Sequence, residues 1–175
     1  MMGSRFWSRR GAAALALATG LLLGTQASAA GVGQKAPEFT APALDGKNKV
    51  SLVAYRGKVV YLDFWASWCP PCLTSLPQLE ELRKQFPSDQ FQILAVNVDQ
   101  DPAKARKFLE RTKIGYPSAT DPKGRIPATF GIETMPTSFL IDRRGVIRYV
   151  HHGFRKGDVA PLRERIKTLV ATREK

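Results

Sequence analysis

Trp68-Cys69-Pro70-Pro71-Cys72 is the stretch that decides the fold of this 175-residue chain, and it holds the only two cysteines. An apolar run over residues 58–66 precedes the pair, and leucines at helical spacing follow it. The cysteines therefore lie at a predicted strand-to-helix junction, a position typical of a dithiol/disulfide redox centre. The first thiol would lie at a helix N-terminus, where free N–H groups and the helix dipole favour a thiolate.

Two other roles are possible for the cysteines: a structural disulfide and half of a zinc site. A zinc site requires three or four Cys or His ligands. The only histidines, His151 and His152, are adjacent, so on a strand they would point to opposite faces. Redox chemistry is therefore favoured, and we expect neither a metal nor another cofactor.

Residues 1–30 have the composition of a secretory signal peptide. Three arginines lie within the first ten residues, an Ala/Leu-rich run covers residues 11–24, and the small residues Ala27-Ser28-Ala29 follow. We expect cleavage after Ala29 or Ala30. The alternative is an uncleaved membrane anchor, but the apolar run is shorter than the roughly 20 residues that span a bilayer.

Residues 31–175 have the length of one domain, and export would place them in an oxidising compartment, which we expect to be the periplasm. A single disulfide that closes so short a loop contributes little stability, because its stabilising effect grows with loop length. A chemical role for the pair is therefore favoured over a structural one.

The chain carries a net charge of +12, of which the three arginines of the signal contribute three. A basic balance can indicate nucleic-acid binding. Here the basic residues are spread along the chain, so we expect no nucleic-acid partner but a solvated basic surface that helps docking on acidic partners or anionic lipid. We expect a monomer.

The order of apolar patterns predicts an α/β fold with a central mixed sheet flanked by helices on both faces. A short edge strand over residues 39–44 would be turned by Asp45-Gly46. Residues 114–129 show turn signals and one short strand. The remaining predicted elements are strands over 58–66, 91–98, 137–142 and 146–151, and helices over 70–86, 102–112 (capped by Asp101) and 158–172.

This order around Trp-Cys-x-x-Cys resembles the thioredoxin fold, and more closely the exported TlpA/ResA-like thiol–disulfide oxidoreductases. The resemblance covers nearly all of the chain after residue 31. The opening Gly33–Phe39 is similar to the N-terminal extension of that family and of peroxiredoxins, and residues 99–126 correspond to its central insert. Met135-Pro136-Thr137 resembles its cis-proline turn.

The resemblance implies three catalytic residues. Cys69 would be the exposed nucleophile, with a pKa lowered to about 7 as in thioredoxin. Cys72, more buried, would attack Cys69 in the mixed disulfide and release reduced substrate. Asp63, six residues before Cys69, has the position of the buried acid of thioredoxin and would serve as general base for Cys72. The alternative role for Asp63 is a hydrogen bond at a strand end.

The resemblance also implies which residues contact bound substrate: Trp68, Pro70, Pro71, Met135 and Pro136. Trp65 is expected in the core instead. One position departs from the family, which commonly has Glu three residues after the second cysteine, where this chain has Ser75.

The expected function is reduction of disulfides in exported proteins, with electrons from a membrane-embedded thiol donor. Two other functions are alternatives to this one. Cys69 and Cys72 could hold Cu(I), since thiolates suit soft metals. A thiol peroxidase would need a proline and a Thr or Ser arranged before its reactive cysteine, and residues 63–68 supply no proline.

Overall fold

Strand β3 (Val59–Trp65) forms the centre of the fold, as its uninterrupted apolar sequence predicts. All seven residues are buried, because both faces of the strand are covered and both edges are paired. The computed structural model describes residues 30–172, and the predicted signal peptide lies outside them except for Ala30. None of the helices in this described range is long and apolar enough to cross a membrane.

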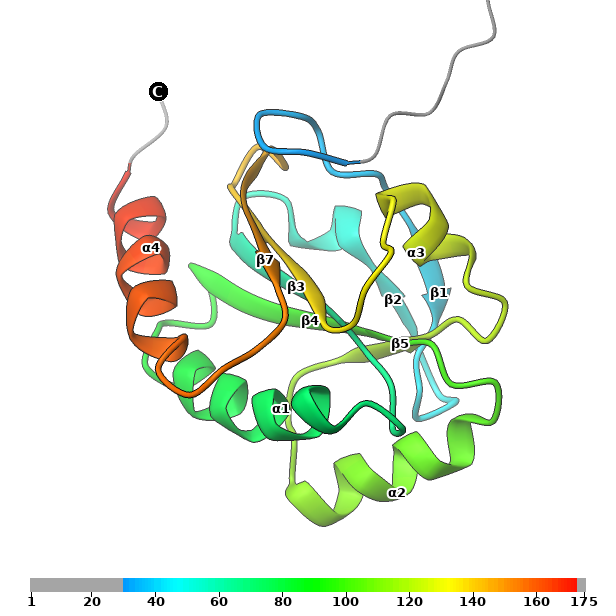
Figure 1. Ribbon diagram of the computed structural model, residues 1–175. Coiled ribbons are helices and arrows are strands. Elements are labelled where there is room, and N and C mark those ends of the chain that lie inside the picture. Colours follow the sequence, from blue (N-terminus) through cyan, green and yellow to red (C-terminus); the bar gives the residue numbers. More distant parts are fainter. Residues whose placement is uncertain (1–29, 173–175) are drawn as a thin grey trace, which may run out of the picture.

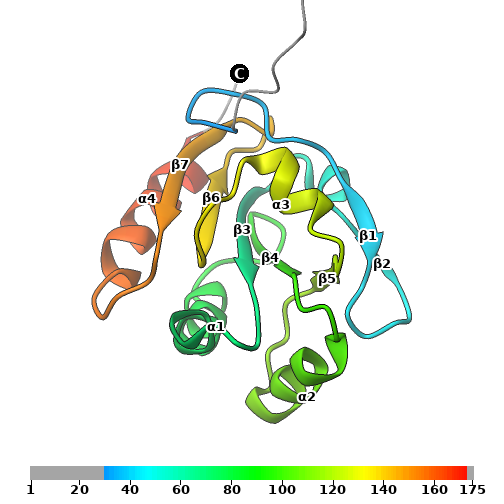
Figure 2. The same ribbon diagram turned by 45° about the vertical axis from the view of Figure 1, so that its right-hand side comes forward.

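The central sheet has five strands in the order β5-β4-β3-β6-β7 (Figures 1 and 2). The pairs β3–β4 and β4–β5 are parallel, whereas β3–β6 and β6–β7 are antiparallel, which confirms the predicted mixed sheet. The other four strands are β4 (Phe91–Asn97), β5 (Ser118–Thr120), β6 (Thr137–Ile141) and β7 (Ile147–His152).

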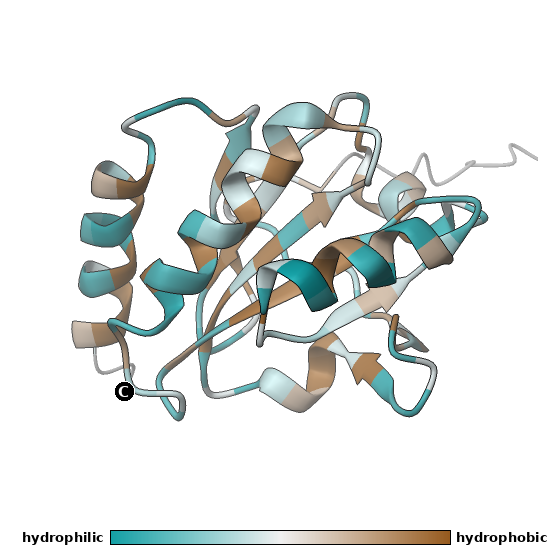
Figure 3. Cartoon of the chain, turned by 90° about the horizontal axis from the view of Figure 1, so that it is seen from below, coloured by the Kyte–Doolittle hydropathy of each residue, from teal (hydrophilic) through white to brown (hydrophobic). Residues whose placement is uncertain are grey.

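Three helices cover one face of the sheet: α1 (Pro70–Arg83), α2 (Pro102–Thr112) and α4 (Val159–Ala171). Their apolar side chains form one cluster with alternate residues of β3, including Tyr61 and Trp65. Figure 3 shows the pattern that causes this packing, with apolar residues concentrated in the central strands and mixed polarity along the helices. Each fully buried Leu or Ile of this cluster contributes about 1.5–3 kcal/mol relative to exposure.

The opposite face is covered by the short helix α3 (Arg125–Phe130) and a two-stranded hairpin of β1 (Thr40–Pro42) and β2 (Lys49–Ser51) (Figure 2). A 3₁₀ turn, η1 (Leu52–Tyr55), connects the hairpin to β3. Helices therefore lie on both faces, as the sequence predicts.

Two elements differ from the sequence-based expectation. The predicted edge strand over residues 39–44 exists as β1, but it pairs with β2, which was not predicted, in a sheet separate from the central one. Within residues 114–129 the structure forms α3 as well as the expected strand β5. The Asp121 carboxylate fixes the start of α3 by accepting from Ile126 N at 2.6 Å, and Gly131 ends it with φ of +65°.

Candidate active site

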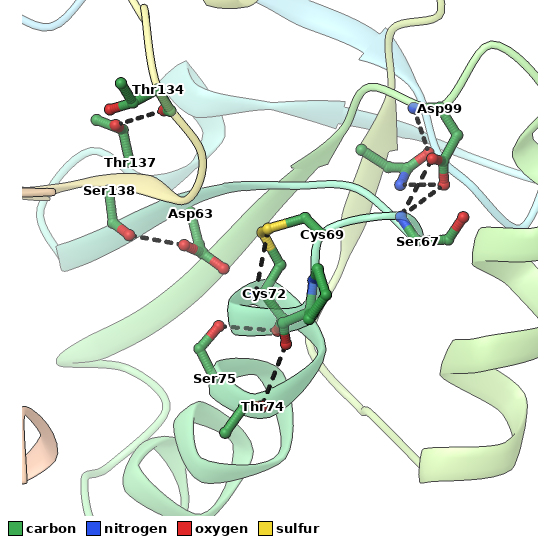
Figure 4. Close-up of a disulfide and its surroundings, with 12 residues drawn as sticks. Asp63, Ser67, Cys69, Cys72, Thr74, Ser75, Asp99, Thr134, Thr137 and Ser138 are labelled. Carbon is green, nitrogen blue, oxygen red and sulfur yellow. Dashed lines mark hydrogen bonds between the residues drawn. A yellow bond between two sulfur atoms is a disulfide. The ribbon is translucent and has the colours of Figure 1, made fainter. Parts of the chain in front are cut away.

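Cys69 and Cys72 form a disulfide at the N-terminus of α1 (Figure 4). Cys69 is the N-cap residue, and Pro70 and Pro71 occupy the first two helical positions, where a missing N–H costs no helical hydrogen bond. The first free helical N–H therefore belongs to Cys72, and it donates to Cys69 Sγ at 3.3 Å. The two prolines thus direct the N-terminal donor of α1 to the sulfur that the sequence assigns to attack.

The two sulfurs lie at different depths, but the difference is small. Cys72 has no exposed surface and Cys69 retains 4%. In this disulfide form Cys69 is therefore less exposed than expected for an attacking thiol. Trp68, by contrast, is 64% exposed and stands beside the pair, whereas Trp65 is fully buried in the core, as expected.

Asp63 lies in the middle of β3 and is almost completely buried. The alternation of the strand places it with Tyr61 and Trp65, on the face that packs against α1 and the cysteines. Figure 4 shows its carboxylate directed toward Cys72, with Ser138 on its other side. The structure thus brings Asp63 to the deeper of the two cysteines.

The two oxygens of the Asp63 carboxyl have different surroundings. Oδ1 accepts from Ser138 Oγ at 2.6 Å, whereas Oδ2 has no hydrogen-bond partner within residues 30–172. Burial raises the pKa of Asp63 from an ordinary value near 3.8 to about 7, and the hydrogen bond from Ser138 opposes that rise. A carboxyl with this pKa gains and loses a proton at neutral pH, as a general base must.

The Met135–Pro136 peptide bond is cis, as the resemblance implies, and it immediately precedes β6. Pro136 is buried and its carbonyl accepts from Gly153 N at 2.8 Å. Within the described residues, neither the N–H nor the carbonyl of Met135 makes a backbone hydrogen bond. Thr137 Oγ1 donates to Thr134 O at 2.8 Å and closes the turn around this dipeptide (Figure 4).

Ser75 occupies the position where the ResA-like family commonly has Glu, and it is buried. Its hydroxyl donates to Cys72 O at 2.9 Å, so it adds a bond within the first turns of α1. Because Ser75 has no carboxyl, the acidic side chain beside the cysteines is supplied by Asp63 on β3 and not by α1.

The loop that carries Trp68 is fixed by Asp99, a residue that the sequence analysis did not single out. Both Asp99 oxygens accept from Ser67 N at 3.1 Å, and Oδ2 also accepts from Asn97 Nδ2 at 3.0 Å (Figure 4). A cleft of about 450 Å³ lies beside this loop, between Trp68 and the start of α2. The sequence signal was the polar Asn97-x-Asp99 at the end of an apolar strand.

The two histidines lie on opposite faces of β7, as expected, with His151 buried and His152 exposed. His151 Nδ1 is 2.9 Å from Tyr61 Oη. Among the described residues, no group of three or more Cys, His, Asp or Glu side chains is arranged to hold a metal ion.

Comparison with known proteins agrees with this geometry. The Redoxin family model matches residues 31–166. The thiol–disulfide oxidoreductase ResA of Geobacillus thermodenitrificans is 35% identical over 144 residues, which cover 82% of each chain. The thioredoxin-like protein YneN of Bacillus subtilis is 36% identical over 69% of this chain and 71% of its own.

A solved structure gives the same result at the level of the fold. A Chlorobium tepidum protein, whose crystal structure is described as that of a thiol:disulfide interchange protein DsbE, superposes with a TM-score of 0.78 at 40% identity. The match covers 82% of this chain and all of that one. With its Cys-x-x-Cys disulfide at the start of α1 and its cis-proline turn before β6, the chain belongs to the Redoxin family, among the ResA-like thiol–disulfide oxidoreductases.

Proposed function

We propose that this protein is exported to the periplasm and there reduces disulfides of other proteins through a Cys69/Cys72 dithiol–disulfide cycle. One observation carries the proposal. Asp63 is a buried carboxyl, and its oxygen Oδ2, which has no hydrogen-bond partner among residues 30–172, faces the deeper cysteine of the pair. Burying a carboxyl without a full set of hydrogen-bond partners destabilises the fold, and such groups are typical of functional sites. Activation of Cys72 is a function that this position allows.

The cycle has two thiol–disulfide exchanges. The Cys69 thiolate attacks one sulfur of the substrate disulfide, and the other substrate sulfur leaves as a thiolate and takes a proton. Asp63 then removes the proton of Cys72, whose thiolate attacks Cys69 in the mixed disulfide. The second substrate sulfur leaves as a thiolate and takes a proton from solvent, so the substrate has gained two electrons and two protons and the protein has become the disulfide.

Substrate would dock at the cis-proline turn and at the loop of Trp68. The N–H and carbonyl of Met135 have no backbone partner within residues 30–172, so they are suited to pair with an extended substrate segment, as an unpaired strand edge does. Trp68 offers an exposed aromatic surface beside the pair, and aromatic residues are enriched in binding surfaces. Pro70, Pro71 and Pro136 would shape the surface between them.

The surroundings of the cysteines favour reduction over oxidation. Within residues 30–172 no Lys, Arg or His side chain makes a hydrogen bond to either sulfur. In the same range Cys69 Sγ accepts a single hydrogen bond, from Cys72 N. A weakly stabilised thiolate makes the disulfide form relatively stable, as a reductant requires. Outside the cytosol the electrons would come from a membrane-embedded thiol donor.

The reduction potential tests the direction of the reaction. Equilibration of the purified protein with glutathione is expected to give a value nearer that of thioredoxin, about −270 mV, than that of DsbA, about −120 mV. The reduced protein should also reduce insulin disulfides. A potential above roughly −150 mV would assign the protein to the oxidants and contradict the proposal.

A further inference from the structure

A row of polar side chains crosses the sheet beneath the active site, on the face that carries Asp63. In the β3–β6 register Asp63 is opposite Ser138, and in the β6–β7 register Ser138 is opposite His151. Tyr61 lies two residues before Asp63 and so shares its face. From there its side chain reaches diagonally across β6 to the histidine on β7.

These groups form a chain of two adjacent hydrogen-bonded pairs, followed by Asp158. Ser138 Oγ is 2.6 Å from Asp63 Oδ1, and Tyr61 Oη is 2.9 Å from His151 Nδ1. Ser138 is opposite both Asp63 and His151 in the strand registers, so it lies between the two pairs. Its hydroxyl also lowers the pKa of Tyr61, which burial raises. His151 Nε2 is 3.2 Å from Asp158 Oδ2, just before α4.

The chain leads from the interior to the surface. Tyr61 and Asp63 are each 1% exposed, Ser138 is 3% exposed and His151 is 8% exposed. The Asp158 side chain at the far end is 29% exposed. Solvent thus reaches one end of the chain, while the other end is the proposed base.

We propose that Ser138, Tyr61 and His151 form a proton relay that returns the proton taken up by Asp63 to solvent at Asp158. This inference rests on the proposed role of Asp63 as general base and adds the positioning residues through which that base is reset.

The donors and acceptors of these five side chains allow a relay. When Asp63 is protonated, it can donate to Ser138, Ser138 to Tyr61, Tyr61 to His151 Nδ1, and His151 Nε2 to Asp158, so every link holds one proton. When each of the first three protons moves one bond along, Asp63 becomes a carboxylate and His151 an imidazolium, and every link again holds one proton. The imidazolium then passes its Nε2 proton to Asp158, from which it leaves to solvent. One proton enters from the Cys72 thiol and one leaves to solvent.

Other ionisable groups around this chain are few. Tyr116, from the segment before β5, packs in the same cluster as the two cysteines, and the charge of Asp63 contributes to its raised pKa. The ring of Tyr149 lies 5.9 Å from that of His151, and α4 presents Arg165 over Tyr149 at 4.1 Å. Arg155 contributes its backbone N–H to Asp158. None of these groups interrupts the path from Asp63 through Ser138, Tyr61 and His151 to Asp158.

Reaction of the reduced full-length protein with 5,5′-dithiobis(2-nitrobenzoate) in a stopped-flow instrument tests the relay. One thionitrobenzoate is released when Cys69 attacks, and a second when Cys72 resolves the mixed disulfide. The probe requires no physiological substrate. The variants are Tyr61→Phe, which removes only the hydroxyl, and His151→Gly, with and without added imidazole.

With a pKa of about 7, Asp63 is partly protonated in the reduced protein at neutral pH, and it must lose that proton through the relay before it can accept the one from Cys72. The relay therefore predicts that both variants keep the first phase and slow the second about tenfold or more at neutral pH, in the lower part of the range for acid–base steps. In each the pH dependence and the solvent deuterium isotope effect of the second phase should change. Imidazole should restore the second phase of His151→Gly, an effect that loss of packing alone does not produce. Tyr149→Phe and His152→Gln, from the same strand, should behave like the parent.

Each outcome decides between the two proposals. If Asp63→Asn slows the second phase but Tyr61→Phe leaves its rate and pH dependence unchanged, only the relay is overturned. If Asp63→Asn leaves the second phase unchanged, the base role and the relay are both wrong. If Tyr61→Phe does not unfold cooperatively, the variant is not properly folded, and the rescue of His151→Gly by imidazole becomes the test. A slowed second phase that imidazole does not restore then overturns the relay.

Discussion

Ser138 and Asp63 are directly opposite in the β6–β3 register, and the serine donates a 2.6 Å hydrogen bond to the carboxylate oxygen Oδ1. This bond favours the ionised form of a carboxyl that burial otherwise keeps protonated. The proton affinity of Asp63 thus depends on two opposed effects, of which burial is the larger, and each can be changed by one substitution.

Removal of the serine hydroxyl should make Asp63 a stronger base that ionises at higher pH. In Ser138→Ala the pKa of Asp63 should rise above its value of about 7, because only the opposing hydrogen bond is lost. The pH profile of Cys72 attack should move to higher pH and its rate at pH 7 should fall. Ser75→Ala removes a hydroxyl that is bonded to the Cys72 carbonyl and serves as control. An identical profile in Ser138→Ala would contradict the assigned electrostatics.

Asp63 should also make the stability of the protein depend on pH. Its folded-state pKa of about 7 lies above its ordinary value near 3.8, so the folded state binds the proton more tightly than the unfolded state. Its protonated form therefore stabilises the fold fully below pH 4. This contribution is lost as the pH rises to about 7, by about 4 kcal/mol at most.

Asp63→Asn removes this dependence. Relative to the parent, the variant should gain up to about 4 kcal/mol of unfolding free energy between pH 4 and pH 8. Urea unfolding of both disulfide forms at the two pH values measures it. The difference between the two pH values is the decisive quantity, because any cost of burying the amide is the same at both. A difference near zero would show that Asp63 has an ordinary pKa.

The two cysteines should respond differently to substitution. Cys69→Ser should abolish disulfide reduction, because no other thiol can attack from the N-terminus of α1. Cys72→Ser should accumulate a mixed disulfide between Cys69 and substrate, which mass spectrometry of non-reduced samples detects. With limiting iodoacetamide, the reduced protein should be labelled at Cys69 first. Preferential labelling of Cys72 would reverse the assignment.

The parts of the fold that the sequence predicted are those with strong local patterns. Strand β3 is a continuous apolar run, and α1 repeats leucines at helical spacing directly after the cysteines. β2 and α3 were missed because they have three and six residues, too few to show a period. In β2 only Val50 is fully buried, so the strand carries almost no apolar signal.

The site was predictable to the extent that its residues are close in sequence or belong to known motifs. Cys69, Cys72 and Asp63 lie within ten residues, and the cis-proline turn matches a family pattern. Ser138 and His151 gain their significance only from the register of β6 and β7. Before the register was known, Tyr61 was one apolar residue in a strand and His151 was considered only as a zinc ligand. Non-local pairing of this kind leaves no periodic signal in the sequence.

Asp99 should determine the position of the loop that precedes Cys69. Its carboxylate accepts Ser67 N through both oxygens at 3.1 Å and is itself held by Asn97 Nδ2 at 3.0 Å, while it remains 3% exposed. In Asp99→Ala the half-buried N–H of Ser67 and the buried Asn97 amide would lose their partner, which should cost about 1–3 kcal/mol of unfolding free energy.

The loss should also reach the chemistry, because Ser67 is two residues from the nucleophile and carries the loop of Trp68. Insulin reduction by Asp99→Ala should fall mainly through a higher KM, since the docking surface is displaced while Asp63 and Cys72 stay in place. Asp101→Ala is the matched control, because that carboxylate caps α2 through Ala103 N and makes no hydrogen bond to the loop within residues 30–172. An Asp99→Ala protein with parental KM and stability would show that the loop is held by its own backbone and not by this carboxylate.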